Sequence, residues 1–213
     1  MIKIDNVDVH NIARAIYSAR NAMNSWAKSD SRFETDTMGE NDLKLAKQLV
    51  KAGTDHSKFM RMITVTLDII APMYWWKEAS TYKVGTVKNS CSTMHTIHKK
   101  EFTLDDFSHE HLTDCYDSNG QLCCEFGWTL ECLINDLNAV RELYLETKDK
   151  KYWWQMIQLL PSSYNQRSTV QLNYAVLRNI YHARKDHKLD EWKIFCKWIE
   201  EELPYSKLIT MEG

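Results

Sequence analysis

The sequence predicts an α+β fold in which helices dominate around a small central sheet. Its 213 residues include only 6 Gly and 3 Pro, and so few helix-breaking residues are typical of long helices with ordered connections. Several segments repeat apolar residues at helical spacing, whereas two short segments have the character of strands. Two strands among roughly six helices indicate the α+β class, and we expect residues 1–213 to form a single domain.

The first third of the chain predicts an edge strand and two helices. Residues 1–5 alternate weakly between apolar and polar, as in a short strand. Helical spacing over residues 8–28 follows residue types that cap helices, so we expect a helix there. The polar segment 29–40 reads as a loop. Asn41 then caps a second helix, which Gly53 ends.

The middle of the chain contains the clearest strand. Apolar and polar residues alternate strictly over 63–69, which predicts a half-buried strand that Pro72 ends. Residues 73–79 predict a short helix. The segment 81–98 is long, polar and irregular, and loops of this kind carry function more often than cores do. A further loop with short helical pieces is expected over 102–121, where Thr103 can cap one of them.

The last third is mainly helical. Apolar residues line one face over 128–146, which predicts a long helix. A second strand is expected to end at 170–172. The remaining helices are predicted over 150–160, 173–184 and 190–202.

Composition excludes several classes of protein. A net charge of −2 does not suit a general polyanion binder, so we expect no nucleic-acid partner. No run of apolar residues is long enough to span a membrane, and the first residues do not read as a secretory signal. The sequence therefore predicts a cytoplasmic protein, whose six cysteines we expect to be reduced.

Motifs for metal binding and catalysis are weak. Residues 109–124 contain two His and three Cys, but the stretch lacks a C-x-x-C pair, so free thiols are favoured over a zinc site. No nucleophile elbow, metalloprotease helix or P-loop motif occurs. We therefore predict no metal and assign no catalytic residue.

Five segments resemble a known family in sequence and in order. They are Leu43 to Gly53 with His56-Ser57-Lys58-Phe59, the strand at 63–70 with Ala71-Pro72-Met73-Tyr74, the loop Asn89-Ser90-Cys91-Ser92-Thr93-Met94-His95, Leu160-Pro161, and the set Arg167, Asn173 and Arg184. Together they resemble the flavin-dependent thymidylate synthases over about residues 40–200. The resemblance implies that family's fold, a tetramer or dimer, and a nucleotide pocket between subunits.

The sequence departs from that family where the family binds its ligands. The Arg-His-Arg triplet that binds flavin is replaced by Thr81-Tyr82-Lys83 or by Tyr82-Lys83-Val84. The Glu and the last Arg of the signature, which serve the dUMP site, stand as Ser90 and as Met94 or His95. Ala175 replaces an Arg that binds the nucleotide phosphate. Because bidentate Arg contacts are lost, we expect no tightly bound flavin and no standard thymidylate synthase activity.

The candidate ligand-binding residues combine this register with polar character. Structural alternatives to ligand binding remain open for three of these features. The loop residues can form a solvated surface loop, Asn173 can be an ordinary helix N-cap, and Arg178 can lie on a solvated helix face. Arg167 and Arg184 match the family directly. The predicted set is Lys83, Asn89, Ser90, Ser92, Thr93, His95, Arg167, Asn173, Arg178 and Arg184.

Three functions stay open at this stage. The first is a non-catalytic nucleotide-binding protein of bacteriophage type that sequesters a nucleotide or a nucleotide signal in counter-defence. The second is a divergent flavin-dependent enzyme, with FAD as cofactor, that modifies a pyrimidine deoxynucleotide. The third is a homo-oligomeric partner-binding protein without a small ligand. It would use one of the pairs Trp75-Trp76 and Trp153-Trp154, since we expect only one ring of each pair to face the core.

Overall fold

The structure, a computed structural model, describes residues 1–212. The chain divides into two compact units. The α5 unit consists of Met1, Ile70–Ala79 and Ser90–Ser168, and the α7 unit consists of Ile2–Ile69, Ser80–Asn89 and the residues from Thr169 onward. Each unit is described by itself below.

A four-stranded sheet has the order β1-β2-β6-β3. Its strands are β1 (Lys3–His10), β2 (Thr64–Pro72), β6 (Asn165–Asn173) and β3 (Val87–Ser90). The alternation that predicted β2 is confirmed, because Val65, Leu67 and Ile69 are buried and the residues between them are partly exposed. The edge strand expected at 1–5 is present as β1, which begins at Lys3 and continues to His10, and the strand expected to end at 170–172 is β6, which ends at Asn173.

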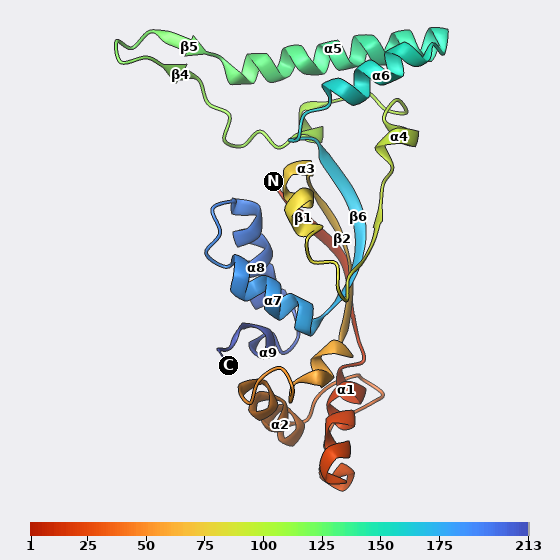
Figure 1. The fold of residues 1–213 in the computed structure, drawn as a ribbon, viewed down its shortest axis with the longest axis vertical. Helices are drawn as coiled ribbons and strands as arrows, with labels where there is room; N and C mark the ends of the chain where they lie inside the picture. Colours follow the sequence, from red (N-terminus) through yellow and green to blue (C-terminus); the bar gives the residue numbers. More distant parts are fainter. Residues whose placement is uncertain (213) are drawn as a thin grey trace. The chain divides into compact units, whose positions relative to one another are not determined.

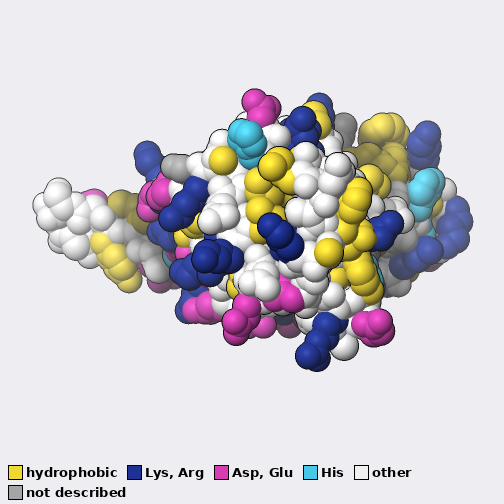
Figure 2. All heavy atoms as spheres, turned by 90° about the horizontal axis from the view of Figure 1, so that it is seen from below, with side chains coloured by type: hydrophobic (Ala, Val, Ile, Leu, Met, Phe, Trp, Pro, Cys, Tyr) yellow, Lys and Arg dark blue, Asp and Glu magenta, His cyan; other side chains and the backbone are white. Residues whose placement is uncertain are grey.

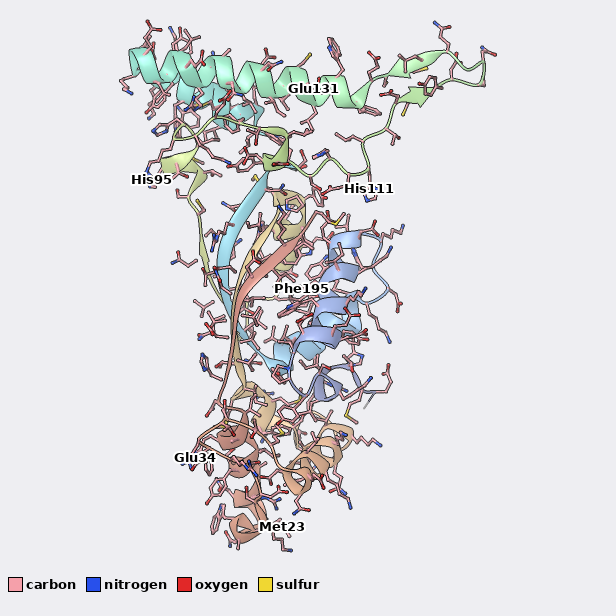
Figure 3. All side chains as sticks on the ribbon, turned by 180° about the vertical axis from the view of Figure 1, so that it is seen from behind. Met23, Glu34, His95, His111, Glu131 and Phe195 are labelled. Atoms are coloured by element: carbon pink, nitrogen blue, oxygen red, sulfur yellow. The ribbon has the colours of Figure 1, made fainter. Side chains whose placement is uncertain are left out.

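In the α7 unit, α7 and α8 lie on one side of the sheet, as Figure 1 and, seen from behind, Figure 3 show. Its fully buried side chains come from both layers and include Leu67, Leu177, Trp192 and Phe195. Its helices are α1 (Ile12–Ala19), α2 (Glu40–Lys51), α7 (Tyr174–Arg184), α8 (Asp190–Glu202) and α9 (Lys207–Thr210), with 3-10 helices at Arg20–Met23, Trp26–Lys28 and Lys58–Arg61.

The helix predicted over 8–28 is wrong at both ends. β1 continues to His10, and Asn11 adopts a left-handed conformation with φ of 71° before α1 begins. The first turn of α1 is capped by a distant residue, since the Ala13 N–H donates to Asp36 Oδ1 at 2.8 Å. After Ala19 the chain tightens into 3-10 turns. The apolar residues keep helical spacing across both breaks, so the sequence pattern alone did not indicate where the helix begins and ends.

The α5 unit is built on one long helix, α5 (Phe126–Thr147), which confirms the helix predicted over 128–146. Its inner face joins α6 and the segment 97–107 in one apolar cluster, which contains Ile97, Phe102, Phe107, Leu130, Ile134, Leu137 and Met156. The other elements are α3 (Met73–Ala79), α4 (Thr93–Thr96), a 3-10 turn at Leu104–Asp106, β4 (Cys115–Tyr116), β5 (Leu122–Cys124) and α6 (Lys150–Leu159).

The loops predicted over 81–98 and 102–121 contain structure that the sequence did not indicate. β3 and α4 lie in the first, and β4 in the second. Thr103 does cap a helical turn, in a reciprocal capping box with Asp106, as expected. β3 was missed because it is short and polar and pairs with the distant strand β6. β4 was missed because it has only two residues.

The two tryptophan pairs behave differently. Trp75 and Trp76 are both buried, so the expectation that one ring would be exposed is wrong for this pair. The rings pack edge to face with centroids 4.9 Å apart, and Trp76 Nε1 donates to the Gln166 carbonyl at 2.8 Å. In the second pair Trp153 is half-buried and Trp154 is 47% exposed, as predicted.

Candidate functional site

The predicted site residues are divided between the two units. Lys83, Asn89, Asn173, Arg178 and Arg184 belong to the α7 unit, and the other five belong to the α5 unit. A single pocket formed by all ten stays a prediction. Within each unit, however, the structure shows which of these residues lie together and what holds them.

In the α7 unit, β6 runs directly into α7 at Asn173. Asn173 caps the helix, because its Oδ1 accepts from the Val176 N–H at 3.1 Å. The loop after α3 crosses this first turn at Gly85, which has a φ of 77°. A Cβ on Gly85 would lie 3.0 Å from Asn173 Nδ2 and 3.1 Å from Val176 Cγ2. A glycine therefore suits this close approach, and Lys83, two residues earlier in the same loop, is exposed.

Arg184 lies at the other end of α7, between two aromatic rings. Its Nε donates to the Tyr82 hydroxyl at 2.9 Å. Its guanidinium carbon is 5.6 Å from the centroid of the Tyr82 ring and 4.9 Å from that of Trp192. These cation–π contacts hold the guanidinium in place. Tyr82 is therefore an aromatic neighbour of Arg184, at a position where the resemblance would place a ligand-binding Arg or His.

Arg178 is engaged by the backbone of the C-terminal segment. Its Nη1 donates to the carbonyls of Leu208, Ile209 and Met211, with 3.1 Å to Ile209. Burial lowers the pKa of Arg178, against the opposing effect of Glu212. These acceptors lie about thirty residues further along the chain, so no local pattern indicates them. Any ligand contact by Arg178 must use its Nε or Nη2.

In the α5 unit, the chain from Ser90 to Cys91 lies against β6 beside Arg167. The Cys91 N–H donates to the Arg167 carbonyl at 2.9 Å, and Gln166 Nε2 donates to the Cys91 carbonyl at 2.8 Å. Ser168 Oγ donates to Ser90 Oγ at 3.1 Å. Two predicted site residues, Ser90 and Arg167, are therefore neighbours, and the Arg167 side chain is exposed.

The other loop residues surround α4. Ser92 precedes the helix and Thr93 opens it, and both are half-buried. His95 is exposed on the helix, where Figure 3 labels it. The Met94 carbonyl between them accepts from Trp153 Nε1 at 3.2 Å, which ties α4 to α6. Asn89, in β3, is exposed.

Two cavities of the α7 unit involve residues outside the predicted site. One, of about 390 Å³, is lined by residues that include His56, Lys58 and Phe59, and this volume is within the range of small-molecule sites. These residues form the segment that resembles the family's Ser-Pro-Phe stretch, so the resemblance could have identified them. The other cavity, of about 710 Å³, is polar, and its lining includes Arg20 and Lys44.

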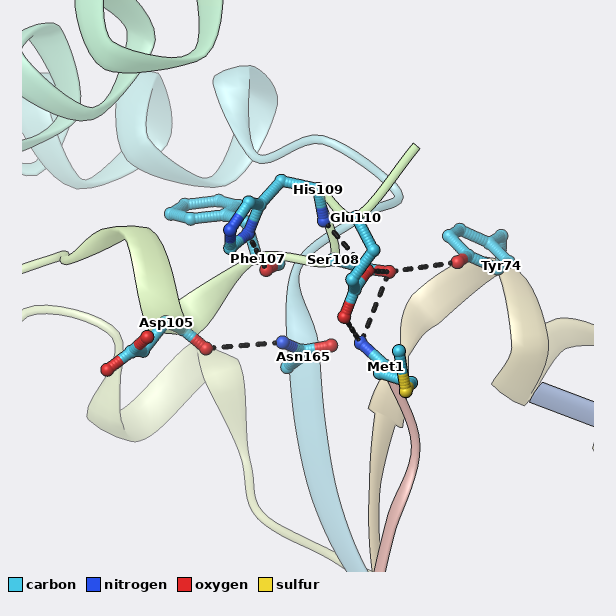
Figure 4. A network of polar contacts seen from close by, with 8 residues as sticks. All are labelled: Met1, Tyr74, Asp105, Phe107, Ser108, His109, Glu110 and Asn165. Carbon is cyan, nitrogen blue, oxygen red and sulfur yellow. Dashed lines mark hydrogen bonds and ion pairs between the residues drawn. The ribbon is translucent and has the colours of Figure 1, made fainter. Parts of the chain in front are cut away.

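A polar network surrounds Ser108 in the α5 unit (Figure 4). Ser108 Oγ donates to Glu110 Oε2 at 2.7 Å and lies 3.1 Å from the Tyr74 hydroxyl. Glu110 also pairs with the ammonium group of Met1. Burial works to raise the pKa of Glu110, but the hydrogen bonds from the ammonium group and Ser108 outweigh it and hold the pKa at about 2. An acceptor-only carboxylate with donors on both oxygens stabilises the chain locally and is a poor proton donor.

On the face shown in Figure 2, Lys and Arg side chains are scattered among acidic and hydrophobic ones and do not form one basic patch. Within residues 1–212, no His, Cys, Asp and Glu side chains gather in a group of three that could hold a metal ion. In the same described part of the chain, no helix is long and apolar enough to cross a membrane.

Solved structures similar to this chain share its fold over their full length. Thymidylate synthase X (ThyX) from Helicobacter pylori, with FAD and dUMP, has a TM-score of 0.70 at 16% identity and covers 100% of this chain and 98% of its own. A second structure of the H. pylori enzyme, complexed with FAD and dUMP, has a TM-score of 0.67 at 17% identity, with 99% and 97% covered. The UMP/dUMP methylase PolB from Streptomyces cacaoi, bound with 5-Br dUMP, has a TM-score of 0.63 at 14% identity, with 99% and 93% covered.

These likenesses confirm the predicted fold class. The chain has an α+β fold of the flavin-dependent thymidylate synthase type. No protein-family model matches the sequence, and no curated protein matches it either.

Proposed function

We propose that this protein binds a nucleotide on a thymidylate synthase-like fold without carrying out the thymidylate synthase reaction. The observation that carries the proposal is the likeness of fold along the whole chain to proteins whose structures hold dUMP or 5-Br dUMP. That likeness supports the proposed class of ligand. The proposed loss of the reaction rests on this chain's own residues.

The residues present do not fit the flavin cofactor that the fold implies. A flavin pyrophosphate needs cations or free backbone N–H groups around it. At the position of the Arg-His-Arg triplet the chain has at most one cation, Lys83, and Tyr82 is occupied by Arg184. Ala175 carries no charge into the first turn of α7. We therefore derive no step through flavin.

The cations that remain support a ligand of nucleotide length. Arg184 lies eleven residues after Asn173, which is about 16 Å along a helix at 1.5 Å per residue. A ligand that contacts the start of α7 and also reaches Arg184 must be about as long as a nucleotide. Its phosphate would gain most from Arg184, whose guanidinium Tyr82 and Trp192 already hold in place.

A binding protein without catalysis suits sequestration. We propose that the protein is of bacteriophage type and withdraws a nucleotide, or a nucleotide signal of host defence, from solution. What supports this is the combination of a fold whose solved relatives bind nucleotides with the absence of a recognisable catalytic motif in the sequence. The proposal assigns ligand contacts to the ten predicted residues and no catalytic role to any of them.

The test is nucleotide binding by paired variants. Binding of dUMP is measured by calorimetry for the parent, for Arg167→Ala and for Arg184→Ala, with Arg32→Ala as a control because Arg32 is an exposed arginine. We expect each site variant to weaken binding by about tenfold or more, since a charge-assisted contact contributes roughly 1.5–3 kcal/mol. Unchanged affinity in both folded variants would overturn the assignment of the pocket.

One alternative keeps a specific observation in its favour. Two of the similar structures hold FAD, so a divergent flavin-dependent enzyme is the second candidate. Purified protein that is yellow and releases stoichiometric flavin on denaturation would establish that alternative. We expect a colourless preparation, and mass spectrometry of the denatured protein then identifies any nucleotide that co-purifies.

A further inference from the structure

The β4–β5 hairpin places two cysteines opposite each other. β4 and β5 pair in antiparallel fashion, with Cys115 opposite Cys124 and Tyr116 opposite Leu122. The partner number falls by two while the first strand advances by one, so Cys123 is an extra residue with nothing opposite it. Figure 1 shows this hairpin leading into α5. The three cysteines are free and exposed.

The turn of the hairpin fixes this register. Asp117 Oδ1 accepts from the N–H groups of Asn119 and Gln121, each at 2.8 Å. The backbone adds bonds from Asp117 to the Gln121 carbonyl at 2.9 Å and from Gly120 to the Asp117 carbonyl at 3.0 Å, with Gly120 at a φ of 77°. An ordered turn holds the two strand ends together, so the opposed thiols meet far more often than in a flexible loop.

The spacing of opposed residues suits a disulfide. Residues directly opposite in an antiparallel pair have Cα atoms about 4.5 or 5.5 Å apart and side chains on the same face. A disulfide needs Cα atoms roughly 4.4–6.8 Å apart. The spacing of a regular antiparallel pair therefore falls within the range that a disulfide needs, and the register places Cys115 opposite Cys124. Cys123 is the extra residue of the bulge, so Cys124 is the cysteine that the register places opposite Cys115.

We propose that Cys115 and Cys124 form a reversible thiol–disulfide pair that responds to low-molecular-weight disulfides such as oxidised glutathione. The Cys115 thiolate attacks one sulfur of the oxidant, breaks its S–S bond and releases one glutathione thiolate. The Cys124 thiolate then attacks the Cys115 sulfur of this mixed disulfide, and a second glutathione thiolate leaves. Two cysteines are oxidised, one glutathione disulfide is reduced to two glutathiones, and the cysteine protons pass to the departing thiolates.

The experiment uses the full chain and its cysteine variants. All four proteins carry Cys91→Ser and Cys132→Ser, so that the hairpin holds their exposed cysteines. Each is reduced and treated with oxidised glutathione, and the intact mass is measured for this parent, Cys115→Ser, Cys124→Ser and Cys123→Ser. Cys123→Ser is expected to lose about 2 Da, the mass of two thiol hydrogens. The parent is expected to lose the same two hydrogens and to retain one glutathione on the exposed Cys123. Cys115→Ser and Cys124→Ser are expected to retain glutathione as a mixed disulfide, because neither has the resolving thiol.

A cleavage at Asp117 locates the bond, because it separates Cys115 from Cys123 and Cys124. The fragments should stay linked in oxidised Cys123→Ser and come apart after reduction. The proposal is overturned if Cys123→Ser also retains glutathione, if the fragments separate without reductant, or if oxidation yields only disulfides between chains. Since Ser replaces an exposed thiol at each hairpin position, the four proteins are compared as folded chains of equal circular dichroism.

Discussion

Replacement of Asp42 by Asn tests how much the buried ion pair of the α7 unit stabilises the fold. Asp42 is fully buried in the first turn of α2, and its partner Arg20 is only 6% exposed. The carboxylate accepts from Arg20 Nε and from Ser29 Oγ, each at 2.6 Å, and also from Ser31. Asp42→Asn keeps the shape of the side chain and removes its charge, so the Arg20 guanidinium stays buried without a counter-charge.

The expected cost is about 3–5 kcal/mol in the free energy of unfolding, the range for removing one partner of a buried pair. Urea denaturation followed by circular dichroism measures it through the midpoint. Glu40→Gln is the matched control, because it removes an exposed carboxylate from the same helical turn and should cost about 1 kcal/mol or less. If Asp42→Asn costs no more than this control, the pair does not contribute as described.

Acid denaturation gives a second measurement of how much the Asp42 carboxylate stabilises the fold. Burial works to raise the pKa of Asp42, but hydrogen bonds from Ser29, Ser31 and Arg20 outweigh it and lower the pKa below its ordinary value of 3.8. Because the folded pKa is the lower one, this group stabilises the fold above pH 3.8, and the contribution is lost as pH falls through the folded pKa. Parent protein should lose stability more steeply than Asp42→Asn in that window.

Three further predictions follow from contacts. Gly39→Ala should lower the free energy of unfolding by about 0.5–2 kcal/mol, because its Cβ would lie 2.2 Å from Cγ of Asp30, whose carboxylate accepts from the Asn41 N–H. An unchanged urea midpoint would contradict this. Gly85→Ala should cost roughly 1–3 kcal/mol because φ is 77° there, and a cost no larger than that of an exposed Ser→Ala change would refute it. Light scattering should show a dimer or tetramer that Trp154→Ser weakens, and a parent that is a monomer at micromolar concentration excludes this interface.

The sequence predicts those elements of the fold that show a regular pattern of apolar residues within their own length. Strict alternation identified β2, and a continuous apolar face identified α5. The boundary at Asn11 could not be found in this way, because the cap of α1 is Asp36, more than twenty residues away. β4 and β5 are likewise strands through their pairing with each other and not through their composition.

The candidate site shows the same limit more sharply. Register with a known family identified Arg184 and Asn173, but it did not indicate that Tyr82 and Trp192 hold the Arg184 guanidinium. The partners of Arg178 are backbone carbonyls near the C-terminus, which carry no side-chain signal at all. Trp76 is buried because a carbonyl of β6 accepts its N–H. Each of these contacts forms between segments that are distant in sequence, so neither composition nor local pattern predicts it.

The contact between Gly85 and Asn173 also constrains how this sequence can evolve. A side chain at position 85 would press on the Asn173 amide that caps α7 and also on the Val176 side chain. Ser or Asp at position 173 would still cap the helix, but neither removes the contact with Val176. A change at position 173 therefore does not compensate for the loss of Gly85, and in a lineage that loses Gly85 we expect the loop to lie further from the start of α7.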